Sequence, residues 1–425
     1  MRRKLKISDI FIPKKILVGD KEIPPMSCSN NGIFPRELKF KKKLSKSLSK
    51  NKVASKGDFI FGLSRQILNF GMMQYDIGCF SSAYKVYECK YSYEFSRFLE
   101  LYMRENHNYF YQCIDGGARE GQTISEEILF SLEILVPSDD EIKAIVNLDE
   151  VFKKKLTFDK KINRTLEKIS KKLFRSWFID FDPVKSKVEK VTSDFSKEIN
   201  NLFPGSFEDS KLGKIPKGWE ITKLKSIINI FGGHAFKSRD YVVDGVFVLR
   251  TKNFDGGIAK NLSDDVFLPK NYLEIYKDFI CEAFDYHLVM VGASIGKTGM
   301  ILPNLLPALR NQNMWCFRPK NEELISRFYT KFTVDVLTNK LMSFASGSAR
   351  DFFRREIFKE HQLVLPSKKI LKFYSEITNL ILKRIALNHK KMILLSSLKK
   401  ILISKFISGK LKITDAEKII SEVST

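Results

Sequence analysis

The sequence predicts an α+β fold in which two similar mixed α/β modules are separated by two long antiparallel coiled-coil helices, with an internal two-fold pseudo-repeat. Three observations lead to this prediction: motifs recur in order at a constant offset, two stretches carry apolar heptads, and the chain is strongly basic. Its 425 residues are enough for two or three domains of ordinary size.

The repeat consists of three pairs of similar segments in the same order. They are GDFIFGLSRQILNFGMM (57–73) with YHLVMVGASIGKTGMI (286–301), DGGAREGQTISEEILFSLEILVPS (115–138) with ASGSARDFFRREIFKEHQLVLPS (345–367), and EKISKKLFRSWF (167–178) with LSSLKKILISKF (395–406). The two members of each pair are separated by nearly the same number of residues as Gly62 and Gly292 are. This period is far longer than a solenoid unit, so it indicates a duplicated module.

Two stretches with heptad spacing predict long helices. The first is expected to begin with a capping box, in which Ser138 accepts from an amide while Glu141 reaches back. Polar residues interrupt both seams midway, which favours pairing of the two helices with each other, and Asn388 would help to fix their register. The alternative is a helix packed on its own module. The seam residues are Leu148, Phe152, Ile162, Leu166, Ile169, Leu173 and Trp177 in the first stretch and Ile370, Tyr374, Ile377, Ile381, Leu395, Leu398 and Leu402 in the second.

The domain organisation follows from the repeat and the helices. The predicted order is module one (1–137), the first spacer helix (138–180), a connector with one short helix (181–212), module two (213–366), the second spacer helix (367–412) and a C-terminal tail (413–425). The residues expected at the helix or subunit interface are Leu166, Ile169, Leu173, Trp177, Leu395, Leu398 and Leu402.

The net charge of +24 points to a polyanionic partner, with nucleic acid ahead of a membrane. A generally Lys-rich composition is the alternative. The six cysteines form no C-x-x-C pair, which argues against a zinc site or disulfides and for a reducing compartment. Without a signal-like start or an 18-residue apolar run, we expect a cytoplasmic protein and no metal site.

None of the catalytic motifs that we tested fits the sequence. A Walker A loop needs four residues between its glycines, whereas Gly292 and Gly296 enclose three, and prolines follow where a helix should start. A nuclease could be drawn from Asp76, Glu88 and Lys90, but E-x-K is common by chance here. The stretch DPV (182–184) lacks the second proline and the aromatic of an adenine methyltransferase loop. We therefore predict no catalytic residue in this chain.

Gly-punctuated loops with a basic residue recur in both modules and are the candidate DNA contacts. Arg65 corresponds to Lys297, and Arg119 corresponds to Arg350. Arginine can bridge a guanine edge or clamp a phosphate, and Asn or Gln suits adenine. The stretch ALRNQNMW adds Arg310, Asn311 and Asn313 to the candidates. An ordinary surface turn is the alternative for each loop, but recurrence favours function.

Together these motifs resemble the DNA-specificity (S) subunit of type I restriction–modification systems over almost the full length. GKIPKGWEITKLKSI (213–227) resembles the opening of a target-recognition domain, and VGASIGKTGMI, SGSARDFFRREIFKEHQLVLPS and LEKISKKLFRSWFIDFDPV resemble the family's turn, Gly-Arg loop and helix. The resemblance implies two target-recognition domains that read double-stranded DNA, and helices that dock modification and restriction subunits. It also implies that S-adenosylmethionine, ATP and Mg act in those partners, with no cofactor in this chain.

Two other function classes stay open at this point. One is an enzyme, either a P-loop ATPase or a standalone nuclease acting on DNA. The other is a scaffold that binds acidic proteins through its helices, which would show no sequence preference on DNA.

Overall fold

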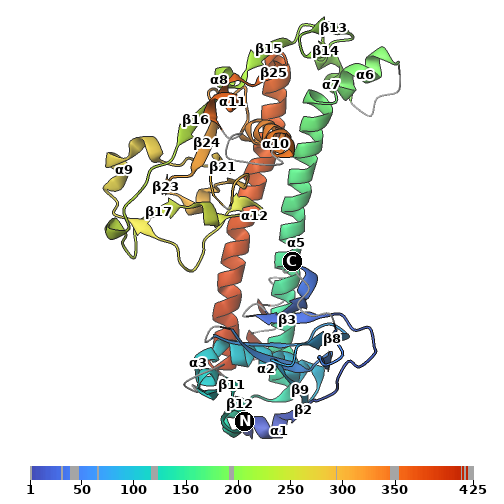
Figure 1. The fold of residues 1–425 in the computed structure, drawn as a ribbon, viewed down its shortest axis with the longest axis vertical. Helices are drawn as coiled ribbons and strands as arrows, with labels where there is room; N and C mark the ends of the chain where they lie inside the picture. The colour runs from blue at the N-terminus through green and yellow to red at the C-terminus, as the bar shows by residue number, and fades with distance from the viewer. Residues whose placement is uncertain are drawn as a thin grey trace. The chain divides into compact units, whose positions relative to one another are not determined.

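The structure is a computed structural model of residues 1–425. It describes all of them except residues 1, 30–31, 39–46, 65–66, 116–122, 191–195, 293, 345–353, 413, 416–417 and 420–425. The chain forms two compact units: unit 1 comprises Met1–Phe158 and Ile393–Thr425, and unit 2 comprises Asp159–Met392. Each unit mixes helices and sheets and includes a part of both long helices, α5 (Asp139–Phe178) and α12 (Lys368–Ile407) (Figure 1).

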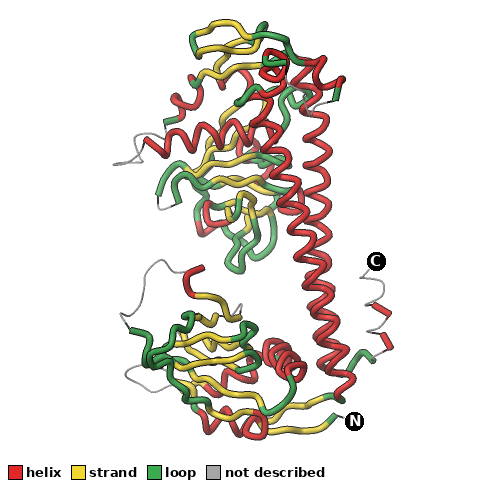
Figure 2. Tube along the Cα trace, turned by 90° about the vertical axis from the view of Figure 1, so that its right-hand side faces the viewer, coloured by secondary structure: helices red, strands yellow, loops and turns green. Residues whose placement is uncertain are grey.

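Figure 2 shows the remaining helices and strands of each unit. In unit 1 they are β1 (Arg3–Lys6), α1 (Ile7–Ile10), β2 (Phe11–Pro13), β3 (Met26–Ser29), β4 (Gly32–Pro35), β5 (Lys52–Ser55), β6 (Phe59–Ser64), β7 (Ile67–Met72), β8 (Ile77–Phe80), β9 (Lys85–Cys89), α2 (Tyr93–Glu105), α3 (His107–Phe110), β10 (Ile114–Asp115), β11 (Thr123–Ile124), α4 (Glu126–Ser131) and β12 (Glu133–Val136).

In unit 2 the elements between the two long helices are α6 (Asp182–Val188), α7 (Lys197–Leu202), β13 (Phe207–Ser210), β14 (Gly213–Pro216), β15 (Glu220–Lys223), α8 (Leu224–Ile227), β16 (Ile228–Gly232), β17 (Val246–Leu249), β18 (Phe254–Asp255), β19 (Gly257–Ala259), β20 (Phe267–Leu268), α9 (Tyr272–Ile275), β21 (Tyr286–Val289), β22 (Thr298–Met300), β23 (Ala308–Arg310), β24 (Met314–Pro319), α10 (Arg327–Phe344), α11 (Arg355–Glu360) and β25 (Gln362–Leu365). The connector therefore contains two short helices, where the sequence predicted one.

The two units share the topology of four sheet strands and of one further strand pair, so the predicted pseudo-repeat is confirmed. The sheet of unit 1 has the order β2-β9-β6-β7, and the first four strands of the six-stranded sheet in unit 2 follow the same order, β16-β24-β21-β22. Every neighbouring pair in both sets is antiparallel. The pair β1–β12 likewise corresponds to β15–β25. Two equal element orders with equal pairing are the structural counterpart of the repeated motifs.

Backbone hydrogen bonds fix which residues of the two units correspond. The amide of Ile7 donates to Leu132 O at 2.9 Å, and that of Leu224 donates to His361 O at 2.8 Å. In the same way, Lys90 N donates to Ile10 O and Lys320 N donates to Ile227 O, both at 2.9 Å. The repeat can therefore be compared residue by residue around α1 and α8.

The long helices are antiparallel within each unit. In unit 2, Asn388 is 5% exposed and its Nδ2 donates to Asn163 Oδ1 at 3.0 Å, so it lies in the helix contact as predicted. In unit 1, the Lys399 ammonium lies 2.7 Å from the Asp149 carboxylate. The capping box at the start of α5 is also confirmed, because Ser138 and Glu141 exchange bonds with each other's backbone amides at 3.0 and 3.3 Å.

The helices are bound to the modules as well as to each other. Trp177 is fully buried against Phe203 of the connector, with ring centroids 5.1 Å apart, and against Phe373 and Tyr374 of α12. Trp219, from the opening of module two, completes this aromatic cluster. Part of each helix is thus a core element of a module. The alternative left open by the heptads, a helix packed on its own module, therefore holds for these parts.

Candidate nucleic-acid interface

The Gly-rich turn 290–297 in unit 2 is the tip of a β-hairpin. Strands β21 and β22 pair antiparallel, and the turn is closed by Val289 N donating to Lys297 O at 2.8 Å and Gly296 N donating to Val289 O at 2.9 Å. The chain continues after Lys297 as strand β22, whereas a P-loop requires a helix there. The turn therefore presents an exposed lysine without the helix N-terminus that holds a nucleotide phosphate.

The tip of this hairpin contacts the end of helix α10. Gly296 has φ +81°, and a Cβ placed there would lie 3.2 Å from Sδ of Met342, in the last turn of α10. Glycine is required because the conformation is left-handed and the helix end is close. Residues 345–353, which contain the predicted Gly-Arg loop, begin directly after α10. The hairpin tip thus lies beside the last turn of α10.

Asn313 lies beside the same hairpin. Its carbonyl accepts from Met290 N at 3.1 Å, and its φ of +70° lets the exposed side chain leave a tight turn before β24. Asn311 is half-buried, and its Oδ1 accepts from Gln312 N at 2.8 Å. The structure therefore brings Lys297 and Asn313 together as exposed groups, whereas the side-chain oxygen of Asn311 is used within its own turn.

Arg310 does not have the exposed position that we expected. It is 2% exposed, and its guanidinium donates to the carbonyls of Gly232 at 2.7 Å, Ile280 at 2.9 Å and Asp278. A guanidinium enclosed by three carbonyls is not available to DNA in this arrangement. The Arg310 side chain instead connects β23 to the end of β16 and to residues 278–280, which is a structural role.

The other three predicted basic contacts, Arg65, Arg119 and Arg350, lie outside the described residues. Strand β6 ends before Arg65 and strand β7 begins after it, and the two strands pair. In the same way, β21 and β22 pair on the two sides of the turn that contains Lys297. An antiparallel strand pair therefore flanks this repeated loop in both units. The DNA contacts themselves stay predictions.

The predicted interface residues of the helices divide into two groups. Trp177 and Leu402 are buried, and Leu166, Leu173 and Leu395 are partly buried against the cores of their units. Ile169 and Leu398 are 50% and 41% exposed. The buried group packs within this chain, and the exposed pair is available to another molecule.

A buried ion network holds α10 on the sheet. Asp285 is fully buried, and its carboxylate accepts from Arg318 at 2.6 and 2.9 Å and from Arg327 at 2.5 Å. Burial alone raises the pKa of Asp285, but the hydrogen bonds and charge of Arg318, His287 and Arg327 hold that pKa below its usual value. Because Arg327 opens α10, this network positions the helix whose other end meets the hairpin.

One group of side chains in the described part of the chain has the chemistry of metal ligands. Ligand atoms of Asp285, His287 and Cys316 lie within 4.8 Å of one another, and all three residues are buried. The carboxylate of Asp285 is already bound by two guanidinium groups. Burial also lowers the pKa of His287 to about 4, which keeps the imidazole neutral at physiological pH. We assign the cluster to the buried ion network of the sheet.

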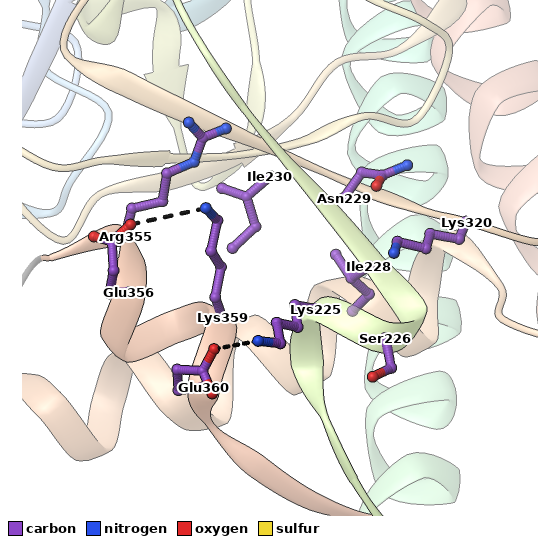
Figure 3. Close-up of a pocket in the computed structure, with 10 residues that line it drawn as sticks. All are labelled: Lys225, Ser226, Ile228, Asn229, Ile230, Lys320, Arg355, Glu356, Lys359 and Glu360. Carbon is purple, nitrogen blue, oxygen red and sulfur yellow. Dashed lines mark hydrogen bonds and ion pairs between the residues drawn. The ribbon is translucent and has the colours of Figure 1, made fainter.

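Sequence reasoning missed a basic pocket in unit 2, shown in Figure 3. It has a volume of about 660 Å³ and is lined by Lys225, Ser226, Ile228, Asn229, Ile230, Lys320, Arg355, Glu356, Lys359 and Glu360. These residues come from α8, β16, the end of β24 and α11, which only the fold brings together. A residue-by-residue comparison of the two modules would have shown the excess of lysine here.

Each helix in the described part of the chain is too short or too polar to cross a membrane.

The chain thus combines a repeated α/β topology with an exposed lysine and an exposed asparagine at neighbouring turns of unit 2. Comparison with known proteins shows what it is similar to. Residues 216–397 match the family model of the type I restriction modification DNA specificity domain. The resemblance of the chain to type I specificity subunits is thereby confirmed.

Individual relatives are distant. The specificity subunit of the type I restriction enzyme MjaIX of Methanocaldococcus jannaschii is 23% identical, over 71% of this chain and 66% of that protein. The HindI specificity subunit of Haemophilus influenzae is 24% identical, over 74% and 76%. The match thus covers slightly less than two thirds of the first relative. The crystal structure of the S subunit from M. genitalium aligns with a TM-score of 0.47 and 16% identity, over 96% of both chains.

Proposed function

We propose that this chain is the sequence-specific DNA-binding subunit of a type I restriction–modification complex and has no catalytic activity of its own. In this proposal each module reads one part of a split, asymmetric target in double-stranded DNA. The observation that carries the proposal is the shared topology of the two units, combined with different side chains at corresponding loops. Two equal frames with unequal loops suit two different base sequences.

The chemistry of the loop cluster in module two supports this reading. Lys297 and Asn313 are exposed at neighbouring turns of unit 2. An ammonium suits guanine acceptors or phosphate, and a carboxamide can pair with the N6 and N7 of adenine. Arg350 and Arg119 would act at the corresponding Gly-Arg loops of the two modules. We expect Arg350→Ala to weaken recognition of one half-site and Arg119→Ala that of the other, whereas an equal loss on all sequences would mean phosphate contact only.

Partner subunits would dock on the long helices. Helix α12 carries four large apolar residues at intervals of seven, Leu380, Leu387, Leu394 and Ile401, and each of them is more than half exposed. Residues seven apart lie on one face of a helix, so this stripe suits an apolar helix of a modification subunit. We propose that methyl transfer from S-adenosylmethionine, and cleavage with ATP and Mg, belong to the modification and restriction subunits, in the cytoplasm.

The docking step has its own test. We expect Leu387→Ser combined with Leu394→Ser to abolish co-purification with the modification subunit and to leave DNA binding by the chain intact. Val243→Ser is the matched control, because Val243 is 97% exposed and lies outside α12. Equal retention of the modification subunit by all three proteins would argue against the stripe.

DNA recognition is tested by competition. The full chain, bound to its selected duplex at physiological salt, is challenged with random duplex, and we expect the specific duplex to compete at least about a thousandfold better. Equal competition is the result expected of a scaffold. An enzyme of the P-loop class would instead bind ATP and lose it on Lys297→Ala while DNA binding stays intact.

A further inference from the structure

The basic pocket of unit 2 combines four cationic side chains with unused hydrogen-bond donors. Glu360 accepts from Lys225 at 2.5 Å, and Glu356 lies 3.8 Å from Lys359. Within the described part of the chain, Lys320 and Arg355 form no ion pair, and the buried Nε of Arg355 has no hydrogen-bond partner. Four positive and two negative side chains leave the pocket with a net positive charge.

The pocket lies at the edge of the sheet. Strand β16 is the outermost strand in the order β16-β24-β21-β22-β19-β18, and Asn229 and Ile230 of this strand line the pocket. Figure 3 shows Lys320 on one side of β16 and Lys225, Lys359 and Arg355 on the other. An edge strand, an amide side chain and four cations form a surface that suits an anion with several acceptor oxygens.

The corresponding positions in unit 1 lack three of the four cations. The matched backbone bonds pair Lys320 with Lys90, Lys225 with Ser8 and Ser226 with Asp9. Helix α11 corresponds to α4, so Glu126 stands where unit 2 has Arg355, and Phe130 stands where it has Lys359. The positions that correspond to the pocket thus carry one lysine and, counting Glu127, three carboxylates, and Glu126 is ion-paired with Lys85 at 3.1 Å. If the shared fold needed these cations, they would occur in both units.

Chain continuity connects the pocket to the candidate DNA loops. Helix α10 ends against the hairpin of Lys297, and α11 begins at Arg355, so residues 345–354 join the hairpin region to the pocket. All four cations also lie within residues 216–397, the part that matches the DNA specificity domain. The Gly-Arg loop is thus bounded by basic features at both of its ends.

We propose that this pocket binds a backbone phosphate of the DNA, and that only module two makes this contact. The inference rests on the proposed function and adds to it an asymmetric anchor, which holds one half of the target independently of its base sequence. An acidic protein is the competing occupant. The observations favour DNA, because Arg355 follows the Gly-Arg loop closely in the sequence and because the apolar stripe of α12 already offers a surface for a protein partner.

The test measures binding of a mixed-sequence duplex by the full chain over a series of salt concentrations. We expect Lys320→Gln and Arg355→Gln each to weaken binding by about tenfold at low salt and to lower the salt slope by about 1, as loss of one phosphate contact requires. Lys90→Gln in unit 1 is the matched control for Lys320→Gln, and we expect it to bind as the unchanged chain does. Circular dichroism checks that all variants are folded.

Three outcomes would overturn the inference. Unchanged slopes for both variants would mean that no phosphate enters the pocket. An equal loss in Lys90→Gln would mean that any surface cation has the same effect. Unchanged DNA binding with loss of the modification subunit would identify a protein as the occupant. If the unchanged chain prefers no DNA sequence, the proposed function fails. If the unchanged chain is sequence-specific and the variants bind DNA as it does, only the proposed phosphate contact in the pocket fails.

Discussion

Replacing Asp285 by asparagine tests whether the buried ion network holds α10 on the sheet of unit 2. The change removes a fully buried carboxylate and leaves Arg318 and Arg327 without their buried partner. Breaking a buried pair from one side costs about 3–5 kcal/mol, because a charge stays buried and uncompensated. Glu282→Gln is the matched control: Glu282 binds the same two arginines but is 48% exposed, so its loss costs about 1 kcal/mol or less.

The three tryptophans of the chain, Trp177, Trp219 and Trp315, all lie in unit 2 and are buried. Their fluorescence during urea unfolding therefore reports on this unit. With a denaturant slope of about 2–3 kcal/mol per molar, Asp285→Asn should lower the midpoint by roughly 1–2 M, and Glu282→Gln by less than about 0.5 M. Equal small shifts in the two variants would refute the reasoning.

The same pair of proteins gives a dependence on pH. The folded pKa of Asp285 is depressed, so its contribution to stability is complete above the unfolded pKa of about 3.9 and is lost as the pH falls through the folded pKa. The difference in midpoint between the unchanged chain and Asp285→Asn should therefore be constant near neutral pH and should shrink below about pH 4. A difference that persists unchanged in acid would assign the effect to packing instead.

Three further predictions concern single side chains. Asp149→Asn should increase hydrogen exchange in α2 and at the end of α12, because the fully buried Asp149 pairs with Arg97 of α2 and Lys399 of α12. Unchanged exchange would mean that these ion pairs do not hold the two helices in place. Asn313→Gly and Asn313→Ala should alter base preference alike. Only the alanine should lower the free energy of unfolding, by about 1–2 kcal/mol, because φ is +70° at this position. Equal free energies of unfolding for the two variants would argue against the strain. Lys297→Ala should weaken DNA binding and leave nucleotide binding unchanged, and fluorescence anisotropy with labelled duplex and labelled ATP separates the two.

Local patterns predicted much of the fold. The capping box and the long helices depend on residues close together in the sequence, and each of these elements is found. The heptads were less accurate in detail: Ile169 is half exposed, whereas Phe174 is buried. The helices also pack on the modules, so the buried face of each helix is wider than a coiled-coil seam.

Contacts between distant segments were beyond the reach of the sequence. Arg310 looks like a surface base in its polar stretch, but the carbonyls that enclose it belong to Gly232, Asp278 and Ile280. The basic pocket likewise joins α8, β24 and α11 and carries no motif of its own. In both cases the role depends on what surrounds the side chain, and that is decided by the fold.

The most direct measurement is selection of bound duplexes from a random pool by the chain with its modification subunit, followed by the same selection with Asn313→Gly. The account predicts two separate groups of specified bases with an unspecified gap, and a loss of preference in only one group for the variant. A single continuous motif, or equal loss in both groups, would contradict the reading of one target by two independent modules.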